Sequence, residues 1–239
     1  MKKKTCYQLF FIIILLLNST LYSQNKIEEF FDNTVGKENL PLNNGFFYFN
    51  TFKTLDTHQF YHINKYSQGE LIYDNQFYNT VNLKYDIFND AIIFKPYGES
   101  ENFGIILIKD KVLQFTLNNR KFINLNLVTK DTIKNIRGYY EENFKGKEFL
   151  FYIKHKKDRR DFIKNQIFYS DFDIYNEFLI FSKGEYFEIN GKKDLTILFP
   201  NYKKEINIFY SENSKLAKDN KTEFYEKIVR FIDQLTLIK

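Results

Sequence analysis

Cysteine, methionine and tryptophan are nearly absent from this chain, and proline and glycine are scarce. Its 239 residues include one cysteine, one methionine, three prolines, nine glycines and no tryptophan. The cysteine is Cys6, so the chain beyond it has no disulfide, no thiol nucleophile and no cysteine-based metal site. The glycines occur singly, which excludes a glycine-rich loop that would hold a phosphate.

The N-terminus has the three regions of a secretory signal peptide. Met1–Lys4 is basic, Leu9–Leu17 is uniformly apolar, and Asn18–Ser23 is mostly polar. The apolar run is about half of the roughly 20 residues that a membrane-spanning helix needs. We therefore expect cleavage after residues 1–23, with a mature chain that begins near Gln24. An uncleaved N-terminal anchor is the alternative.

An excess of charge of one sign is also lacking once the signal peptide is removed. Residues 1–23 hold three lysines and no acidic residue, so 32 basic and 30 acidic residues remain. A net charge of about +2 gives no long-range field to attract nucleic acid, and we expect no nucleic-acid partner. The mature chain is predicted to be periplasmic or secreted, without a cofactor and without a transmembrane span.

Short segments of high β-propensity fill the middle of the chain and are separated by short polar turns. Val81–Ile87 alternates apolar and polar residues, which predicts a half-buried strand. Asp74 and Asn75 tolerate the left-handed conformation of a tight turn, so they predict a hairpin. No helical crossover fits between Gly69 and Leu127, and the expected topology is therefore an antiparallel meander.

The charged segment Lys154–Lys164 is predicted to be a solvated hairpin loop, residues 128–137 a polar connection, and Asp171–Asp173 a turn. The predicted strands are Phe46–Phe49, Leu71–Tyr73, Gln76–Tyr78, Val81–Ile87, Ala91–Phe94, Gly104–Ile108, Val112–Leu117, Phe122–Leu127, Gly138–Tyr140, Glu148–Ile153, Ile167–Tyr169, Glu177–Phe181 and Glu185–Ile189.

Helical periodicity replaces strand periodicity after Gly191. Asp194–Phe199 is predicted to be a short helix, and Asn201 is predicted to cap a second helix over Tyr202–Tyr210. A further short helix is expected near the N-terminus, around Ile27–Phe31.

The final helix is predicted to begin at Asn220, with Glu223 three positions later. Its apolar stripe consists of Phe224, Ile228, Phe231, Ile232 and Leu235, and it must be buried against another element. The predicted fold class is therefore α+β: a mainly antiparallel β meander, as a curved sheet or partly open barrel, with a helical C-terminal region. The expected organisation is a signal peptide at 1–23, a β-rich domain at 24–190, and a helical region at 191–239 packed on the same domain.

His58 and His62 are the sharpest candidates for a metal site, because histidines four positions apart lie on one face of a helix. However, the residue after His58 is glutamine, where zinc proteases have a glutamate that acts as base. The two residues between them, Phe60 and Tyr61, favour a strand, which would separate the histidines by roughly 13 Å. We therefore expect no metal at these histidines, nor at the third one, His155.

Paired carboxylates suggest glycoside hydrolysis, which needs two such groups across a cleft. The pairs are Glu141 with Glu142, and Asp171 with Asp173. Surface turns are the simpler interpretation, and no catalytic residue is predicted.

Two clusters of basic residues suggest binding surfaces. Lys145–Lys157 interleaves lysines with aromatic residues, as single-strand nucleic-acid binders do. Lysines of the C-terminal region could contact an anionic membrane, and these are Lys192, Lys193, Lys203 and Lys204. The nearly neutral mature charge favours a solvated surface in both places.

The order of several segments resembles a family of exported proteins from flavobacteria-like (Bacteroidetes) bacteria. The resemblance covers most of the mature chain and includes the Tyr-Ser-Gln-Asn sequence around the end of the signal. It implies bacterial export and a non-catalytic role, and no catalytic residues carry over from it. The segments are GELIYDNQFYNTVNLKYDIFNDAII, VLQFTLNNRKF, GYYEENFKGK and SKGEYFEINGKKDLTILFPNYKKEI.

The predicted function is that of an exported, non-catalytic binding or accessory protein of the bacterial cell envelope, with an unknown envelope protein as partner. The alternative is a carrier of an apolar, lipid-like ligand in the curved sheet. The second alternative is a hydrolase of exported polymers whose carboxylates are unidentified.

Overall fold

The computed structural model describes residues 40–129 and 136–237. The predicted signal peptide and the predicted helix around Ile27–Phe31 lie outside these ranges. Within them the strands are β1 (Phe46–Phe47), β2 (Ser67–Tyr73), β3 (Gln76–Asp86), β4 (Ala91–Lys95), β5 (Ile105–Ile106), β6 (Val112–Leu117), β7 (Arg120–Asn124), β8 (Tyr139–Lys145), β9 (Phe149–Lys164), β10 (Ile167–Ser182) and β11 (Glu185–Glu188). The helices are η2 (Pro41–Asn43), η3 (Lys109–Lys111), α2 (Leu125–Thr129), α3 (Lys192–Leu198), η4 (Pro200–Tyr202), α4 (Lys203–Glu212), α5 (Ser214–Asp219) and α6 (Lys221–Leu237).

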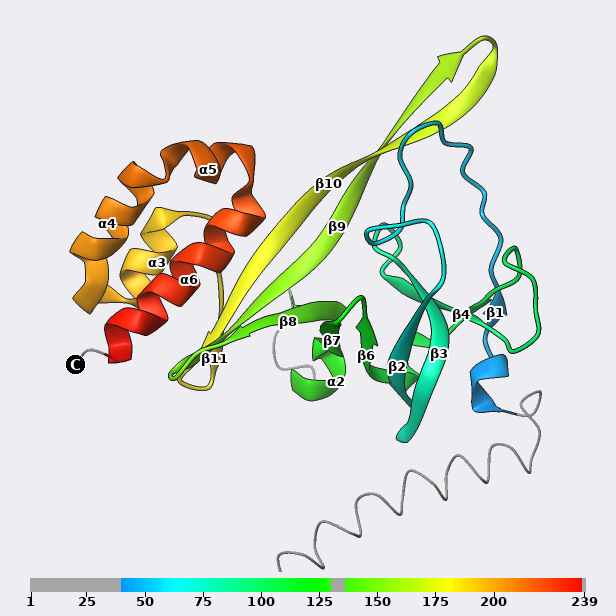
Figure 1. The fold of residues 1–239 in the computed structure, drawn as a ribbon, viewed down its shortest axis with the longest axis horizontal. Helices are drawn as coiled ribbons and strands as arrows, with labels where there is room; N and C mark the ends of the chain where they lie inside the picture. The colour runs from blue at the N-terminus through cyan, green and yellow to red at the C-terminus, as the bar shows by residue number, and fades with distance from the viewer. Residues whose placement is uncertain (1–39, 130–135, 238–239) are drawn as a thin grey trace, which may run out of the picture.

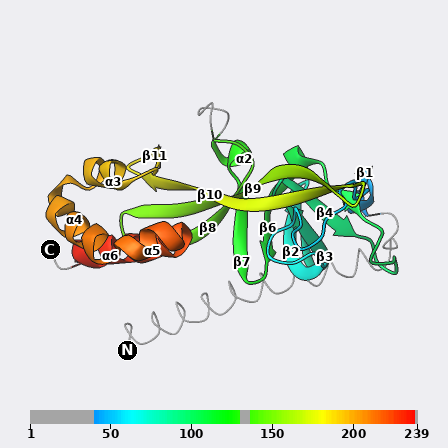
Figure 2. The ribbon, with the colours of Figure 1, turned by 90° about the horizontal axis from the view of Figure 1, so that it is seen from above.

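All the described strands belong to one antiparallel sheet that does not close into a barrel (Figure 1). Their order is β1-β5-β4-β3-β2-β6-β7-β8-β9-β10-β11, so neighbours in the chain are mostly neighbours in the sheet. The last helices gather at one end of the long strands, beside β8 and β11 (Figure 2). The α+β class, with its antiparallel meander and helical C-terminal region, is therefore confirmed.

Tight turns with left-handed residues connect the strands of the meander. Asp74 and Asn75 have φ of 52° and 65°, the combination that a two-residue hairpin turn requires. Val81, Leu83 and Tyr85 are buried on one face of β3, as predicted. The strand is not half-buried, however, because Lys84 and Asp86 on the other face are buried as well. The sequence pattern thus fixes both the turn and the register of this hairpin.

Aromatic side chains fill the inner face of the curved sheet. Phe115 and Phe122 lie directly opposite each other on β6 and β7, and their rings stack at 4.7 Å. Tyr85 and Tyr139 pack edge-on against Phe115, with centroids 5.3 Å away in each case. Aromatic pairs of this geometry add about 0.5–1.5 kcal/mol beyond the area that they bury.

The strands β9 and β10 form one long hairpin of 16 residues on each side. At about 3.3 Å per residue it is roughly 50 Å long. The predicted loop at Lys154–Lys164 and the predicted turn at Asp171–Asp173 are therefore wrong. The charged residues of this segment are tolerated in a strand because they pair across the hairpin, as Arg160 and Asp171 do at 2.9 Å. Such a strand lacks the alternation of apolar and polar residues by which a sequence predicts a strand.

Two shorter corrections concern helix boundaries. The predicted strand Phe122–Leu127 ends at Asn124, whose amide donates to the backbone oxygens of Lys109 and Val112, both at 3.0 Å. Helix α2 starts at the next residue. Asn201 does not cap a helix, because the chain first makes the 3-10 turn η4 and α4 begins only after it.

The C-terminal helices share a core with β9 and β10. Phe151 and Phe178 on the sheet pack in one buried cluster with Phe224, Ile228 and Ile232 of α6. This burial confirms the predicted position of the apolar stripe. None of the helices in the described ranges has the length and apolar character needed to cross a membrane.

The start of α6 is fixed by the predicted cap. The Asn220 side-chain oxygen accepts from the Glu223 backbone N–H at 3.1 Å, and the Asn220 amide donates to the Glu223 carboxylate at 3.1 Å. This reciprocal pair satisfies a backbone donor that the first turn of a helix leaves free. The start of α6 lies beside the long hairpin (Figure 1), where Asn176 Nδ2 of β10 donates to Thr222 Oγ1 at 2.9 Å.

Candidate functional site

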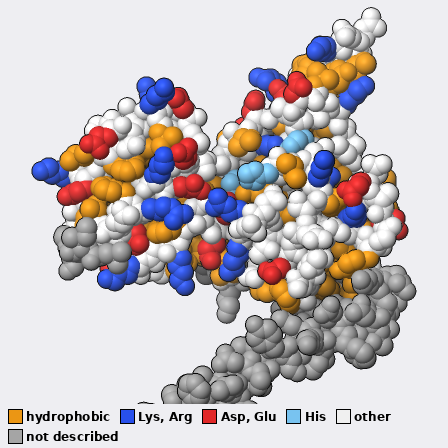
Figure 3. Space-filling model, in the orientation of Figure 1, with side chains coloured by type: hydrophobic (Ala, Val, Ile, Leu, Met, Phe, Trp, Pro, Cys, Tyr) orange, Lys and Arg blue, Asp and Glu red, His pale blue; other side chains and the backbone are white. Residues whose placement is uncertain are grey.

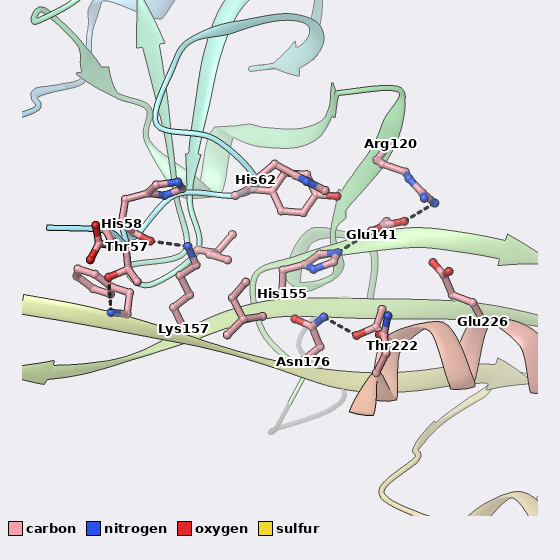
Figure 4. A pocket seen from close by; sticks show the side chains of 16 residues that line it. Thr57, His58, His62, Arg120, Glu141, His155, Lys157, Asn176, Thr222 and Glu226 are labelled. Atoms are coloured by element: carbon pink, nitrogen blue, oxygen red, sulfur yellow. Dashed lines mark hydrogen bonds and ion pairs between the residues drawn. The ribbon is translucent and has the colours of Figure 1, made fainter. Parts of the chain in front are cut away.

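A pocket of about 630 Å³ lies where the β9–β10 hairpin meets the loop before β2 and the start of α6 (Figure 4). In the space-filling view, the histidine side chains mark the hollow between the helices and the β-rich body (Figure 3). The lining residues are Asp56, Thr57, His58, Tyr61, His62, Ile87, Arg120, Glu141, His155, Lys157, Phe172, Ile174, Asn176, Asn220, Thr222 and Glu226.

All three histidines of the chain line this pocket. The expected strand at His58–His62 is wrong, since these residues form an irregular loop and His62 has a left-handed φ of 53°. The loop brings His62 close to His155 on β9 and His58 close to Lys157 on the same strand. Even so, no group of three or more His, Cys, Asp or Glu side chains within the described ranges is placed to hold a metal ion.

Glu141 on β8 is the most firmly held charge of the pocket. Its side chain is 3 % exposed and accepts hydrogen bonds from His155 Nε2 at 2.6 Å, Asn143 Nδ2 at 2.8 Å and Arg120 Nη1 at 3.1 Å. Burial raises the pKa of the Glu141 carboxyl, but the hydrogen bonds and charges of His155, Asn143 and Arg120 outweigh it, and the pKa is lowered. Glu141 is therefore ionised.

The carboxylate of Glu141 orients the His155 ring. Because Nε2 faces a carboxylate, it carries the proton in the neutral ring and leaves Nδ1 as a hydrogen-bond acceptor. The ring packs against Tyr61, at 4.8 Å, and Phe122, at 6.0 Å, which also contact each other. An imidazole held in this way is the arrangement that a general base or a ligand-binding acceptor requires.

A second carboxylate comes from α6. Asn143 Nδ2 donates to Glu226 Oε1 at 2.7 Å as well as to Glu141, so one amide links the sheet to the final helix. The expected pairing of Glu141 with Glu142 is not found, because Glu142 makes its ion pair with Lys121 at 3.5 Å. Glu226 is instead the carboxylate that the fold brings to Glu141.

The other expected carboxylate pair lies outside the pocket. Asp171 and Asp173 both lie within 4 Å of the Arg160 guanidinium on the exposed part of the hairpin, at 2.9 and 3.8 Å. Asp171 also accepts a hydrogen bond from the Thr57 hydroxyl at 2.5 Å. These contacts hold the loop before β2 against β10.

Lys157 is the buried cation of the pocket. Its side chain donates to the backbone oxygens of His58 and Phe60, the latter at 2.9 Å. Burial lowers the pKa of the Lys157 ammonium to about 8, and the nearby charge of Asp86 offsets only part of this effect. Burial also lowers the pKa of His58, and the charge of Lys157 lowers it further.

Uncharged polar groups complete the wall on the side of α6. Asn176 Nδ2 donates to Thr222 Oγ1 at 2.9 Å, while Asn176 Oδ1 is buried without a hydrogen-bond partner in the described residues. Tyr61 and Phe172 add aromatic surface. The pocket thus combines donors, acceptors and apolar walls, which suits a small polar ligand.

Sequence reasoning missed Arg120, Lys157, Thr222 and Glu226. A signal for Lys157 was present, because residues 155 and 157 have the same strand parity as Phe151 and Ile153, which face the helices. It was hidden by the interpretation of this segment as a loop. One of the two suggested basic surfaces lies elsewhere, since Lys192, Lys193, Lys203 and Lys204 are exposed on α3 and α4. The other, Lys145–Lys157, includes two pocket residues, His155 and Lys157.

A second pocket, also of about 630 Å³, lies beside β11 and α3. One part of its wall is apolar and is formed by Tyr186, Ile189, Ile197 and Leu198.

Comparison of the chain with protein-family models, with curated proteins and with solved structures finds no match. The chemistry of the first pocket is therefore the basis of the functional proposal.

Proposed function

We propose that this chain is an exported, non-catalytic binding protein of the bacterial cell envelope, and that the pocket beside α6 holds its ligand. The observation that carries the proposal is the convergence of all three histidines with Arg120, Glu141 and Lys157 in one pocket. These side chains come from distant parts of the chain. Export rests on the charged, apolar and small-residue order of residues 1–23.

Burying the charges of Glu141 and Lys157 costs folding free energy that apolar residues at the same positions would not cost. Replacing a buried ion pair by apolar residues of similar volume is often neutral or stabilising. Glu141 and Lys157 are nevertheless kept in a concave site, and each has a shifted pKa. Shifted pKa values in a cleft are characteristic of functional sites. A polar ligand would use the donors and acceptors that the fold holds there.

A pocket-filling variant tests this proposal. Thr222→Trp places a large side chain at the wall formed by α6, and Ser211→Trp on the exposed part of α4 is the matched control. Thermal unfolding would be followed with amino acids, sugars, sugar phosphates and dicarboxylates as probes. A ligand present at 100 times its Kd stabilises the protein by about 2.7 kcal/mol.

The expected result is that one class of probe raises the Tm of the wild type and of Ser211→Trp, but not of Thr222→Trp. The proposal is contradicted if the probe stabilises all three proteins equally, or if none of the four classes raises the Tm of the wild type.

Hydrolysis is the second candidate function, and one observation favours it. His155 is held by Glu141 with Nδ1 free to accept a proton, as a general base that activates water needs. Nitrophenyl esters and nitrophenyl glycosides are suitable probes. Turnover by the wild type that is lost in Glu141→Gln would support a hydrolase, and no turnover of either substrate class by the wild type would reject it.

The carrier of an apolar ligand stays a prediction, and the pocket beside β11 and α3 is the place to test it. Native mass spectrometry of protein from its own host would detect a co-purifying lipid. Ile197→Asp should then abolish that lipid adduct.

A further inference from the structure

Lys157 holds a buried charge without a carboxylate partner. The residue is 8 % exposed. The ion pairs within residues 40–129 and 136–237, defined by a nitrogen–oxygen distance of at most 4.0 Å, do not include it. The other buried lysine of this strand, Lys154, contrasts with it, since Lys154 pairs with Asp90 at 2.7 Å. A buried cation without a counterion is costly, and an anion in contact with it would remove much of that cost.

The hydrogen bonds of Lys157 leave one donor for a ligand. A lysine ammonium has three N–H groups, and two of them are used by the backbone oxygens of His58 and Phe60. These two carbonyls fix the position of the ammonium at the pocket wall (Figure 4). The third N–H is therefore available on a side chain that is already immobilised.

His58 supplies a second donor close to Lys157. Its Nδ1 accepts from the backbone N–H of Phe60 at 3.2 Å, so the proton of the neutral ring is on Nε2. The charge of Lys157 acts on this ring strongly enough to lower its pKa. Two donors held in place on the same wall of the pocket match an acceptor-only group such as a carboxylate or a phosphate.

Resting on the proposed ligand pocket, we propose that Lys157 and His58 form an anion subsite that holds a carboxylate or phosphate group of the bound molecule. The other end of the pocket has Glu226 and the group of Glu141, Arg120 and His155, and it holds the remainder of the ligand through both donors and acceptors. The two ends therefore differ in chemistry, and a ligand enters the pocket in one orientation.

Proton uptake accompanies anion binding at this subsite. The pKa of Lys157 is about 8, so near pH 8 part of this side chain is a neutral amine. A neighbouring anion raises that pKa, and the neutral fraction then takes up a proton to become ammonium. The titratable groups that face Lys157 are His58, His62 and Asp86, with Asp56 at the pocket wall. The pKa values of both histidines are lowered from 6.5, so these rings titrate below this range and the signal of Lys157 is followed between pH 7 and 9.

Lys157→Met tests the subsite, and Lys156→Met is its matched control. The control removes a lysine one position away that pairs with Glu177 at the surface, at 2.7 Å. The full chain would be titrated at pH 7 with acetate, inorganic phosphate and methyl phosphate as probes, by calorimetry and thermal unfolding. Loss of a hydrogen bond to a charged group should weaken binding of the preferred anion about tenfold or more in Lys157→Met only. Acetate against the two phosphates distinguishes a carboxylate from a phosphate.

A second measurement does not depend on a variant that folds. The ammonium signal of Lys157 in the wild type would be titrated by NMR with and without the preferred anion, and its pKa should rise when the anion is present. The subsite is contradicted if the pKa of Lys157 stays unchanged, or if Lys157→Met binds the anion as tightly as Lys156→Met. If neutral sugars still stabilise the wild type but not Thr222→Trp, the ligand pocket stands and only the anion subsite fails.

Discussion

Asp90 lies at the centre of a second cluster of polar side chains, which it forms with Tyr85, Lys109 and Lys154. Its replacement should be among the most damaging single changes in the sheet. Its carboxylate accepts hydrogen bonds from Tyr85 Oη at 2.6 Å and from Lys154 Nζ at 2.7 Å, and it also pairs with Lys109. The Lys154 side chain is 7 % exposed and that of Asp90 17 %. Asp90→Asn therefore leaves a buried ammonium without its counterion.

The expected cost of Asp90→Asn is about 3–5 kcal/mol in the free energy of unfolding, the range for a buried ion pair that loses one partner. The matched control is Asp74→Asn, which removes an exposed pair with Lys111 at 2.7 Å. Exposed pairs contribute about 0–1 kcal/mol, so the control should be nearly neutral. Urea unfolding would be followed by tyrosine fluorescence, since the chain has 18 tyrosines and no tryptophan.

The pH dependence of stability gives a second test of the Asp90→Asn prediction. Burial raises the pKa of Asp90, but the charges of Lys154 and Lys109 outweigh it and hold the pKa below the ordinary 3.8. A carboxyl with a lowered folded-state pKa contributes stability above its unfolded pKa and loses it as the pH falls through the folded pKa. The difference between wild type and Asp90→Asn should therefore shrink below pH 3.8. Equal stability of the two variants and the wild type at pH 7 would refute the reasoning.

Two further substitutions and one titration have expected outcomes of their own. Gly138→Ala should destabilise the same centre by about 1–3 kcal/mol in urea unfolding, because Gly138 has φ of 85° and an added Cβ would lie 1.7 Å from Asp90 Oδ2; a neutral effect would contradict this contact. Asn220→Ala should cost about 1 kcal/mol through loss of the α6 cap, whereas Asn201→Ala should cost little, and equal costs would argue against the cap. In imidazole NMR, His58 and His62 should titrate below 6.5, so their contribution to stability is complete above that pH and is lost as the pH falls through their folded pKa values; ordinary values for both would contradict their burial.

The sequence predicted the part of the fold that depends on local signals. The turn at Asp74 and Asn75, the apolar core face of Val81–Tyr85 and the cap at Asn220 each need only neighbouring residues, and all three are found. The boundary at Phe122–Leu127 was missed because Asn124 makes its hydrogen bonds to distant backbone oxygens.

The site was harder to predict because it depends on long-range pairing. Lys154–Lys164 has the composition of a loop, and only its register with β10 shows that its charges are paired or buried. Once this segment is a strand, His155 and Lys157 share a face and meet the loop of His58. Glu226 shows the same limit, since it reaches Glu141 only when α6 packs on the sheet.

The three histidines offer the most direct measurement of the central claim, that the pocket beside α6 is the ligand site. Since the chain has three histidines and all of them line this pocket, their imidazole signals report on it without any label or substitution. The wild-type protein would be titrated by NMR with whichever probe raises its Tm. We expect the signals of His58, His62 and His155 to shift together and to saturate at the concentration that saturates the Tm. A probe that raises the Tm to saturation while all three imidazole signals stay in place would contradict the account.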